Sequence, residues 1–294
     1  MGGVDDAIIL AGGKGTRMLP ANLYMPKETM PLVDTPILNH LIWEAARAGV
    51  KRVHLVLSQS KKSILNQFIV NGSIHGEEVR PDLPREALSL GTDGVEIVPH
   101  LQLNADGVAD AISAALADIN GPFLVILGDM LLLEEHLSPM FSGPESGSSA
   151  SEKLVSKFEE EGRPCVGVFP VNMSEVSNYG VVELIENVVV AIEEKPLESE
   201  ASSNYVLCGR YLFPEGTQDI LERYPVSEFG ELQSIFFMRH LIENQGLNAV
   251  KFENMCMYDS GNPLIWLKSQ IDHALRREDL GNDLAEWFTD RLKE

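Results

Sequence analysis

Cysteine is scarce in this chain of 294 residues. The three cysteines, Cys165, Cys208 and Cys256, are odd in number, far apart in the sequence and without a Cys-x-x-Cys pair. Small disulfide scaffolds and structural zinc sites depend on closely spaced sets of cysteines. The cysteine pattern therefore argues against both kinds of framework.

Long apolar runs are lacking as well. Residues 1–6 carry no lysine or arginine, and the apolar stretch that follows is interrupted at Gly12. A signal peptide needs a basic start and a longer apolar segment, and a membrane-spanning helix needs about 20 apolar residues. The sequence predicts neither, and together with the cysteine pattern it favours a cytoplasmic location.

Positive charge is in short supply. The chain has 23 lysines and arginines against 44 aspartates and glutamates, which gives a formal net charge of -21. Such a chain repels nucleic acids and anionic membranes, so neither is expected as a partner. A phosphate ligand would also be repelled by the molecule as a whole. Any phosphate site must therefore gather cationic side chains, a metal ion or backbone amides locally.

Apolar segments alternate between strand and helix patterns in the first half, and at 44% hydrophobic residues the chain can bury a substantial core. Continuous apolar strands joined by a crossover helix are typical of parallel strands buried on both faces. Strands are predicted at residues 7–11, 53–57, 95–98 and 123–127, and helices at 37–48 and 108–119.

The second half of the chain changes character. Strands are predicted at residues 164–171, 180–184, 188–192, 205–213 and 255–258, the second and third of them as an antiparallel hairpin, with helices at 232–244 and 263–277. The glycine- and serine-rich residues 142–151 predict a mobile surface loop. The expected fold class is α/β: an open, doubly wound, mixed but mainly parallel sheet, with an antiparallel part and C-terminal helices.

A glycine-rich turn follows the first strand. Glycines let the backbone approach a ligand closely, so successive N–H groups can point at phosphate oxygens. A Walker loop is absent, and a dinucleotide-binding turn would need a glycine where Met18 stands. Arg17 and Lys27 add positive charge; a plain turn with solvated cations is the alternative. The turn comprises Leu10, Ala11, Gly12, Gly13, Lys14, Gly15, Thr16 and Arg17.

Three acidic side chains lie at the ends of predicted strands. Asp129 and Asp259 follow residues 123–127 and 255–258. Ligands of open α/β sheets gather at the carboxyl ends of strands, where two carboxylates could share one Mg²⁺. Each aspartate alone also fits an ordinary turn. Glu194 and Lys195, before Pro196, either reach into a cleft or form an exposed charged loop.

These motifs together resemble those of the sugar-1-phosphate nucleotidyltransferase family, and within it most closely the bacterial UTP–glucose-1-phosphate uridylyltransferases. The resemblance covers nearly the whole chain. It is carried by the turn at residues 10–17 and by residues 26–36 (PKETMPLVDTP), 106–111 (DGVADA), 127–129 (LGD), 178–182 (NYGVV), 194–196 (EKP), 203–205 (SNY) and 258–262 (YDSGN).

The resemblance implies a Rossmann-like nucleotidyltransferase fold. Its catalytic domain would span residues 1–262, with a nucleotide-binding part at about 1–135 and a sugar-binding part at about 160–262, and residues 263–294 would form a helical tail. Its relatives also imply a homo-oligomer, either a dimer or a tetramer.

The resemblance also implies roles for single residues. Leu10, Ala11, Gly12, Gly13, Lys14, Gly15 and Thr16 would hold the triphosphate, and Gln102 and Gly107 the pyrimidine; Arg17, Lys27 and Lys195 would be catalytic; Gly180, Glu194, Lys195 and Leu207 would bind the sugar phosphate; Asp129 and Asp259 would bind Mg²⁺ as the cofactor.

The implied partners are a nucleoside triphosphate and a hexose 1-phosphate. The leading expectation is nucleotidyl transfer from UTP to glucose 1-phosphate or a close analogue, which gives a UDP-sugar and pyrophosphate. A dTTP-dependent enzyme is one alternative, because uracil and thymine differ by a methyl group that contributes only about 1 kcal/mol of discrimination. A non-catalytic sugar-nucleotide sensor or scaffold subunit is the other, although it would have no need for both metal carboxylates.

Overall fold

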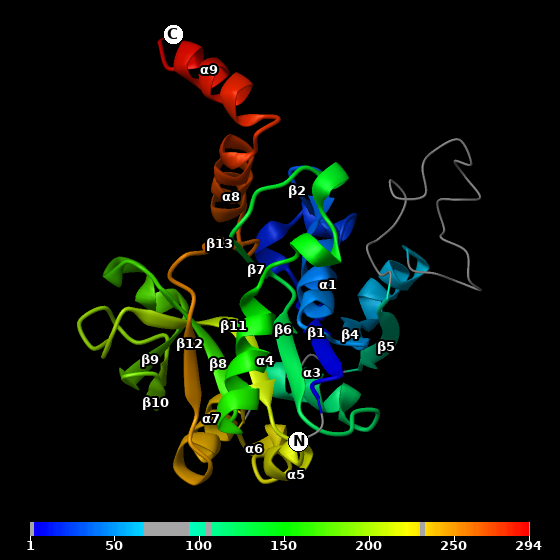
Figure 1. The fold of residues 1–294 in the computed structure, drawn as a ribbon, viewed down its shortest axis with the longest axis vertical. Helices are drawn as coiled ribbons and strands as arrows, with labels where there is room; N and C mark the ends of the chain where they lie inside the picture. The colour runs from blue at the N-terminus through cyan, green and yellow to red at the C-terminus, as the bar shows by residue number, and fades with distance from the viewer. Residues whose placement is uncertain (1–2, 68–93, 104–106, 230–232, 294) are drawn as a thin grey trace.

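The computed structural model describes residues 3–67, 94–103, 107–229 and 233–293. Within these residues the centre of the molecule is a nine-stranded mixed sheet (Figure 1). In sheet order its strands are β5 (Glu96–Gln102), β4 (Arg52–Ser58), β1 (Asp6–Leu10), β6 (Phe123–Leu127), β11 (Tyr205–Phe213), β8 (Cys165–Pro170), β12 (Asn248–Lys251), β10 (Val188–Glu194) and β9 (Gly180–Ile185).

Strand β1 lies inside the parallel half of this sheet. It pairs with β4 on one side and β6 on the other, and β4 pairs in parallel with β5. Successive side chains of β1 point to opposite faces: Ala7 and Ile9 belong to one core cluster, and Ile8 and Leu10 to the other. Because both faces are covered, the strand is apolar without interruption. The predicted strands of this half are confirmed.

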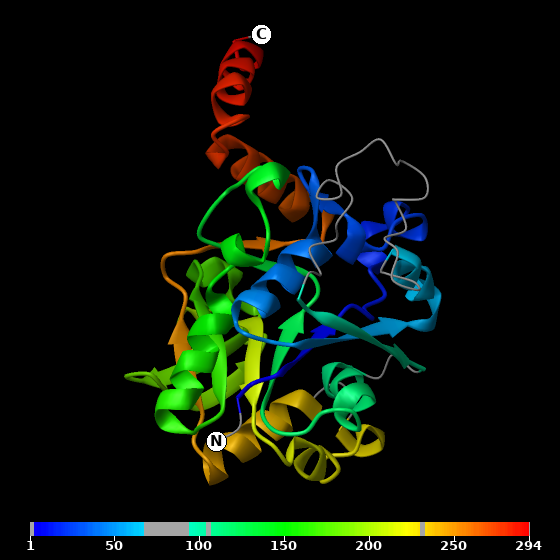
Figure 2. The same ribbon diagram turned by 45° about the vertical axis from the view of Figure 1, so that its right-hand side comes forward.

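Helices cover both faces of the sheet. Side chains of α1 and α4 pack in the cluster that contains Ile9, and those of α3, α5 and α7 pack in the cluster that contains Ile8; Figure 2 shows the two layers from a second direction. The helices are α1 (Ile37–Arg47), α3 (Val108–Leu116), α4 (Ala150–Glu161), α5 (Thr217–Leu221), α6 (Val226–Phe229), α7 (Gln233–Asn244), α8 (Pro263–Arg276) and α9 (Gly281–Arg291).

The other half of the sheet is mostly antiparallel. Strand β11 runs antiparallel to β6 and β8, and β9 and β10 form the predicted hairpin, with Glu186 at φ 58° in its turn. Among the described strand pairs of the sheet, four are parallel and five antiparallel. The predicted mixed α/β architecture is confirmed, but "mainly parallel" describes only the half around β1.

Two short sheets lie beside the main one. Strand β7 (Met130–Leu133) pairs with β13 (Cys256–Asp259), and β2 (Pro31–Leu32) pairs with β3 (Thr35–Pro36). The predicted strand near Tyr258 therefore exists, but it pairs with β7 outside the main sheet. Helices α8 and α9 then lead away from the body of the molecule, and α9 projects from it (Figures 1 and 2).

The prediction of a mobile loop at residues 142–151 is wrong for its second half. Ser148, Ser149 and Ser151 are buried, and α4 begins at Ala150. The hydroxyl of Ser151 donates to Glu44 at 2.6 Å, and the backbone N–H of Ser149 donates to Glu134 at 3.2 Å. These carboxylate partners, distant in sequence, let polar serines start a packed helix.

The described helices do not meet the requirements for a membrane-spanning helix. None of them combines the length and the apolar character that crossing a bilayer requires.

Candidate active site

The glycine-rich turn leaves the end of β1 between two neighbouring strands. The N–H of Ala11 donates to the carbonyl of Val56, and the carbonyl of Leu10 accepts a bond from the N–H of Gly128. Gly12 is buried, whereas Gly13, Lys14, Thr16 and Arg17 are exposed. The base of the turn is therefore fixed to the sheet, and its tip with two cationic side chains faces outward.

Asn22 holds the tip of the turn against the following segment. Its side-chain amide donates to the carbonyl of Lys14 at 3.0 Å and accepts from the N–H of Lys27 at 2.9 Å. Gly15 has φ 59°, and a Cβ there would lie 2.2 Å from the Asn22 amide nitrogen. Glycine suits this position, because a side chain would meet both backbone strain and a clash with Asn22.

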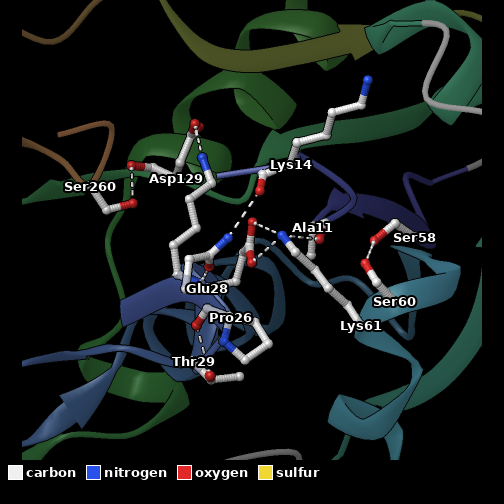
Figure 3. A network of polar contacts seen from close by, with 12 residues as sticks. Ala11, Lys14, Pro26, Glu28, Thr29, Ser58, Ser60, Lys61, Asp129 and Ser260 are labelled. Atoms are coloured by element: carbon white, nitrogen blue, oxygen red, sulfur yellow. Dashed lines mark hydrogen bonds and ion pairs between the residues drawn. The ribbon is translucent and has the colours of Figure 1, made fainter. Parts of the chain in front are cut away.

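Lys27 connects the turn with an aspartate from the neighbouring strand. Its ammonium lies 2.5 Å from Oδ2 of Asp129, and it also lies 3.9 Å from the position that a Cβ on Gly13 would occupy. The Lys27 side chain is 10% exposed. The alternative interpretation, a plain turn with solvated cations, therefore does not describe Lys27. Lys14 differs: its side chain points away from Asp129 and Glu28 (Figure 3).

The two candidate metal ligands are brought together by the small β7–β13 sheet. Asp129 directly precedes β7, and Asp259 at the end of β13 stands opposite Met130. Both the N–H and the hydroxyl of Ser260 donate to the carbonyl of Asp129, at 3.0 and 3.3 Å. The aspartates thus meet through this second sheet, without Asp259 belonging to the main one.

The carboxylates of Asp129 and Asp259 are close enough for their charges to interact. Burial, and after it the charge of Asp129, raises the pKa of Asp259, while the Gly261 N–H, Lys27 and Arg17 oppose the shift. A divalent cation bound between the two carboxylates would relieve their repulsion, and carboxylate oxygens are suitable ligands for such a cation. Among the described residues no cluster of three or more acidic, histidine or cysteine side chains suits a metal. The donor chemistry fits Mg²⁺, which takes one or two carboxylates together with substrate phosphates.

Gln102 lies at the end of β5 beside the turn. A Cβ on Gly12 would lie 2.8 Å from its Oε1, and its Nε2 donates to the Asp110 carboxylate at 2.7 Å and to the Gly107 carbonyl at 3.3 Å. Gly107 caps the start of α3 with φ 106°. Gln102 and Gly107, the two residues expected to recognise the base, therefore lie together next to the glycine-rich turn. Asp106 of the same motif lies outside the described residues.

The predicted sugar-phosphate residues also form one group, on β9, β10 and β11. Gly180 stands opposite Glu194, and a Cβ on Gly180 would lie 3.2 Å from both Glu194 Oε2 and Leu207 Cδ1. Lys195 has φ 48°, and its ammonium lies 3.2 Å from Glu194. The Lys195 side chain is 60% exposed, against 10% for Lys27.

Tyr179 links this group to the aspartates and was not predicted as a site residue. Its carbonyl accepts a bond from the N–H of Lys195 at 3.0 Å. Burial raises the pKa of its phenol to about 12, and the charges of Asp259 and Asp129 contribute. Its one signal in the sequence is its position directly before Gly180. Asp110, the partner of Gln102, is a second site residue that was not predicted, although it lies within the motif at residues 106–111.

The chain is similar to known nucleotidyl transferases over nearly its whole length. The sequence profile described as "Nucleotidyl transferase" matches residues 6–267. A UTP–glucose-1-phosphate uridylyltransferase of Haemophilus influenzae is 30% identical, over 98% of this chain and 99% of that protein. Among solved structures, UDP-glucose pyrophosphorylase of Acinetobacter baumannii has a TM-score of 0.82 at 25% identity, covering 98% of this chain and 99% of that one. The UTP-bound enzyme from the same organism has a TM-score of 0.82 at 26% identity, over 97% and 99%.

Proposed function

Because the chain belongs to the nucleotidyl transferase family, we propose that it transfers the uridylyl group of UTP to glucose 1-phosphate or a close hexose 1-phosphate. The products are a UDP-sugar and pyrophosphate. One observation carries the proposal. The glycine-rich turn lies close to Lys27, Asp129 and Asp259 at one end of β1 and β6. Relatives named for this reaction align over nearly their whole length.

In this proposal one half of the sheet binds the nucleotide and the other half binds the sugar phosphate. The nucleotide-binding part covers about residues 1–135, wound in the Rossmann-like manner, and the sugar-binding part covers about 160–262. Together they form the catalytic domain 1–262, and residues 263–294 are a helical tail. The support is that the turn and Gln102 lie at the ends of β1 and β5, whereas Gly180 and Glu194 lie on β9 and β10.

The triphosphate is held by the turn. The amides of Gly12, Gly13 and Gly15 donate to phosphate oxygens, with Leu10, Ala11, Lys14 and Thr16 completing the loop. Arg17 and Lys27 neutralise phosphate charge in a molecule whose overall charge opposes it. Gln102 offers its side-chain carbonyl to the N–H on the edge of uracil, because both N–H groups of its amide already donate to Asp110 and Gly107.

Mg²⁺ held by Asp129 and Asp259 supplies positive charge for the α-phosphate and the leaving pyrophosphate when it is bound. The residues of the chain position the other reactant: Glu194 accepts hydrogen bonds from sugar hydroxyls, Gly180 and Leu207 shape the pocket, and Lys195 binds the sugar phosphate. A phosphate oxygen of the sugar attacks the α-phosphorus in line, and the bond to the pyrophosphate oxygen breaks.

No protein base is required, because the attacking phosphate is already an anion. Positioning and charge stabilisation can therefore supply most of the rate acceleration. This agrees with a site built from amides, lysines and carboxylates.

A substrate panel tests the proposal. The purified protein is incubated with Mg²⁺, each of UTP, dTTP, ATP and GTP, and several hexose 1-phosphates, and pyrophosphate release is measured. We expect the highest kcat/KM for UTP with glucose 1-phosphate. A preference for dTTP would make the protein a thymidylyltransferase, and no release in any combination would favour a sensor or scaffold subunit.

We also propose a homo-oligomer, either a dimer or a tetramer, in the cytoplasm. The support for self-association is the projecting C-terminal part, where Leu264, Leu267 and Trp287 are all more than half exposed. Light scattering after size-exclusion chromatography measures the oligomeric state directly.

A further inference from the structure

A buried ion pair lies beneath the glycine turn. Lys61 belongs to the 3₁₀ helix Gln59–Gln67 and is 4% exposed; Glu28 belongs to the 3₁₀ helix Lys27–Thr29 and is 1% exposed. The ammonium of Lys61 donates to the two Glu28 oxygens at 2.8 and 2.7 Å and to the carbonyl of Ala11 at 3.1 Å (Figure 3). An ammonium has three N–H donors, so each finds a partner inside the protein.

These contacts join three segments that carry the proposed ligand groups. Ala11 is the residue before Gly12 and Gly13, and Glu28 follows Lys27. The Glu28 side chain also packs against Gly128, where an added Cβ would lie 3.2 Å from Glu28 Cγ, and Gly128 precedes Asp129. The ion pair therefore stands where the glycine turn, the cation and the metal carboxylate converge.

Stability alone gives little reason for a charged pair in this place. Burial raises the pKa of Glu28 and lowers that of Lys61, and the attraction between them works against both shifts. Well-packed apolar side chains of similar volume commonly replace a buried ion pair without loss of stability. What they cannot replace is the bond from Lys61 to the Ala11 carbonyl at the base of the turn.

We propose that Lys61 and Glu28 are positioning residues for nucleotidyl transfer. Their bonds hold the carbonyl of Ala11, and with it the amides of Gly12 and Gly13, in place relative to Lys27 and Asp129. Both roles rest on the proposed function, and they add to it two residues that touch no substrate.

A matched pair of amide substitutions gives the first test. Glu28→Gln keeps the side-chain length and the packing against Gly128 but weakens the hold on Lys61. Asp6→Asn is the control, because Asp6 is also 1% exposed and binds His54 and Arg52 at the opposite end of β1. Glu28→Gln is expected to raise KM for UTP and to lower kcat/KM by about tenfold or more, as a misplaced phosphate site would. Asp6→Asn is expected to lower Tm but leave both KM values unchanged.

A double substitution separates positioning from stability. Lys61→Met alone leaves Glu28 buried without its partner and should lower both Tm and kcat/KM. Adding Glu28→Met removes both charges at similar volume, so Tm should recover while kcat/KM stays about tenfold below that of the unmodified protein. Recovery of kcat/KM together with Tm would overturn the positioning role, as would normal UTP kinetics in folded Glu28→Gln. Failure of the proposed function is distinct: the unmodified protein would then release no pyrophosphate with any substrate pair, which overturns both.

Discussion

The ammonium of Lys27 lies 2.5 Å from Oδ2 of Asp129, across 102 residues of sequence. The lysine side chain is 10% exposed and the aspartate side chain 36%, so the cation is fixed in place while the carboxylate remains accessible. Lys27 also lies beside Gly13 of the turn. A preorganised cation between amides and a carboxylate costs little to reorganise when an anionic ligand arrives. We expect Lys27 to exchange part of its contact with Asp129 for a phosphate oxygen when the nucleotide binds.

The first prediction concerns the two aspartates. Asp129→Asn and Asp259→Asn keep the shape of the side chains but remove the charge that would hold a divalent cation, so turnover should fall at least about a hundredfold. Tm should change little for Asp259→Asn, because burial and Asp129 already disfavour its charged form. Pyrophosphate release across a Mg²⁺ titration measures the effect.

Asp5→Asn serves as the control for both aspartates, since the carboxylate of Asp5 pairs with Lys51 on the surface. Normal turnover in either site variant would remove that residue from the metal site.

The second prediction concerns the closeness of the turn to Gln102. In Gly12→Ala the new methyl group would lie 2.8 Å from Gln102 Oε1, and this flexible side chain can move aside at small cost to the fold. Tm should therefore stay near that of the unmodified protein, while KM for UTP rises and the preference for UTP over other nucleotides weakens. Gly143→Ala, where the added carbon meets nothing within 4 Å, is the matched control. Unaltered nucleotide preference in Gly12→Ala would separate Gln102 from base recognition.

The sugar side of the site allows a third, independent prediction. In Gly180→Ala the methyl group would lie 3.2 Å from both Glu194 Oε2 and Leu207 Cδ1, so these side chains must give way by a few tenths of an ångström. KM for glucose 1-phosphate should rise several-fold, about 1 kcal/mol of lost binding, with little change in KM for UTP. Initial-rate kinetics with each substrate varied in turn distinguish the two constants. An equal rise in both would mean that Gly180 does not belong to a separate sugar subsite.

Much of this site was predictable because its signals are local in sequence. The turn after β1 consists of consecutive residues, Asp129 follows β6 after Gly128, and Asp259 ends β13. The hairpin that carries Gly180 and Glu194 shows its two strands and its turn in one short stretch. Such features need only the chain direction and the periodicity of side chains.

The unpredicted parts depend on partners that are remote in sequence. Lys61 lies in a run of polar residues that looks like any solvated surface, and its burial follows from Glu28 and Ala11. The start of α4 could not be predicted because serine is usually a loop residue. The burial of these serines becomes favourable through their hydrogen bonds to Glu44 and Glu134. The pairing of β13 with β7 could not be predicted either, because the sequence of a short apolar strand does not specify which strand it pairs with.

Three histidines behind the proposed metal site suggest a property unrelated to catalysis. His40 on α1, His136 after β7 and His273 on α8 pack together, with the Nδ1 atoms of His136 and His273 3.0 Å apart and the rings of His40 and His273 6.3 Å apart. Burial, followed by the neighbouring histidines, lowers the pKa of His40 to about 3 and that of His273 to about 4. The pKa of His136 is also lowered by burial. The described groups that oppose these shifts are Asp34 and Asp272.

The last prediction is therefore a loss of stability in mild acid. The folded state keeps these rings neutral, whereas the unfolded chain binds protons below its ordinary pKa of 6.5, so the free energy of unfolding must fall as pH drops from about 6.5 towards 4. For His40 the expected loss is about 2 kcal/mol by pH 5. His40→Phe keeps an aromatic ring without a titrating nitrogen, and it should leave Tm at pH 8 nearly unchanged while flattening its decline in acid. Tm measured from pH 8 to pH 5 for both proteins decides the matter, because parallel curves would mean that His40 is not held neutral by the fold.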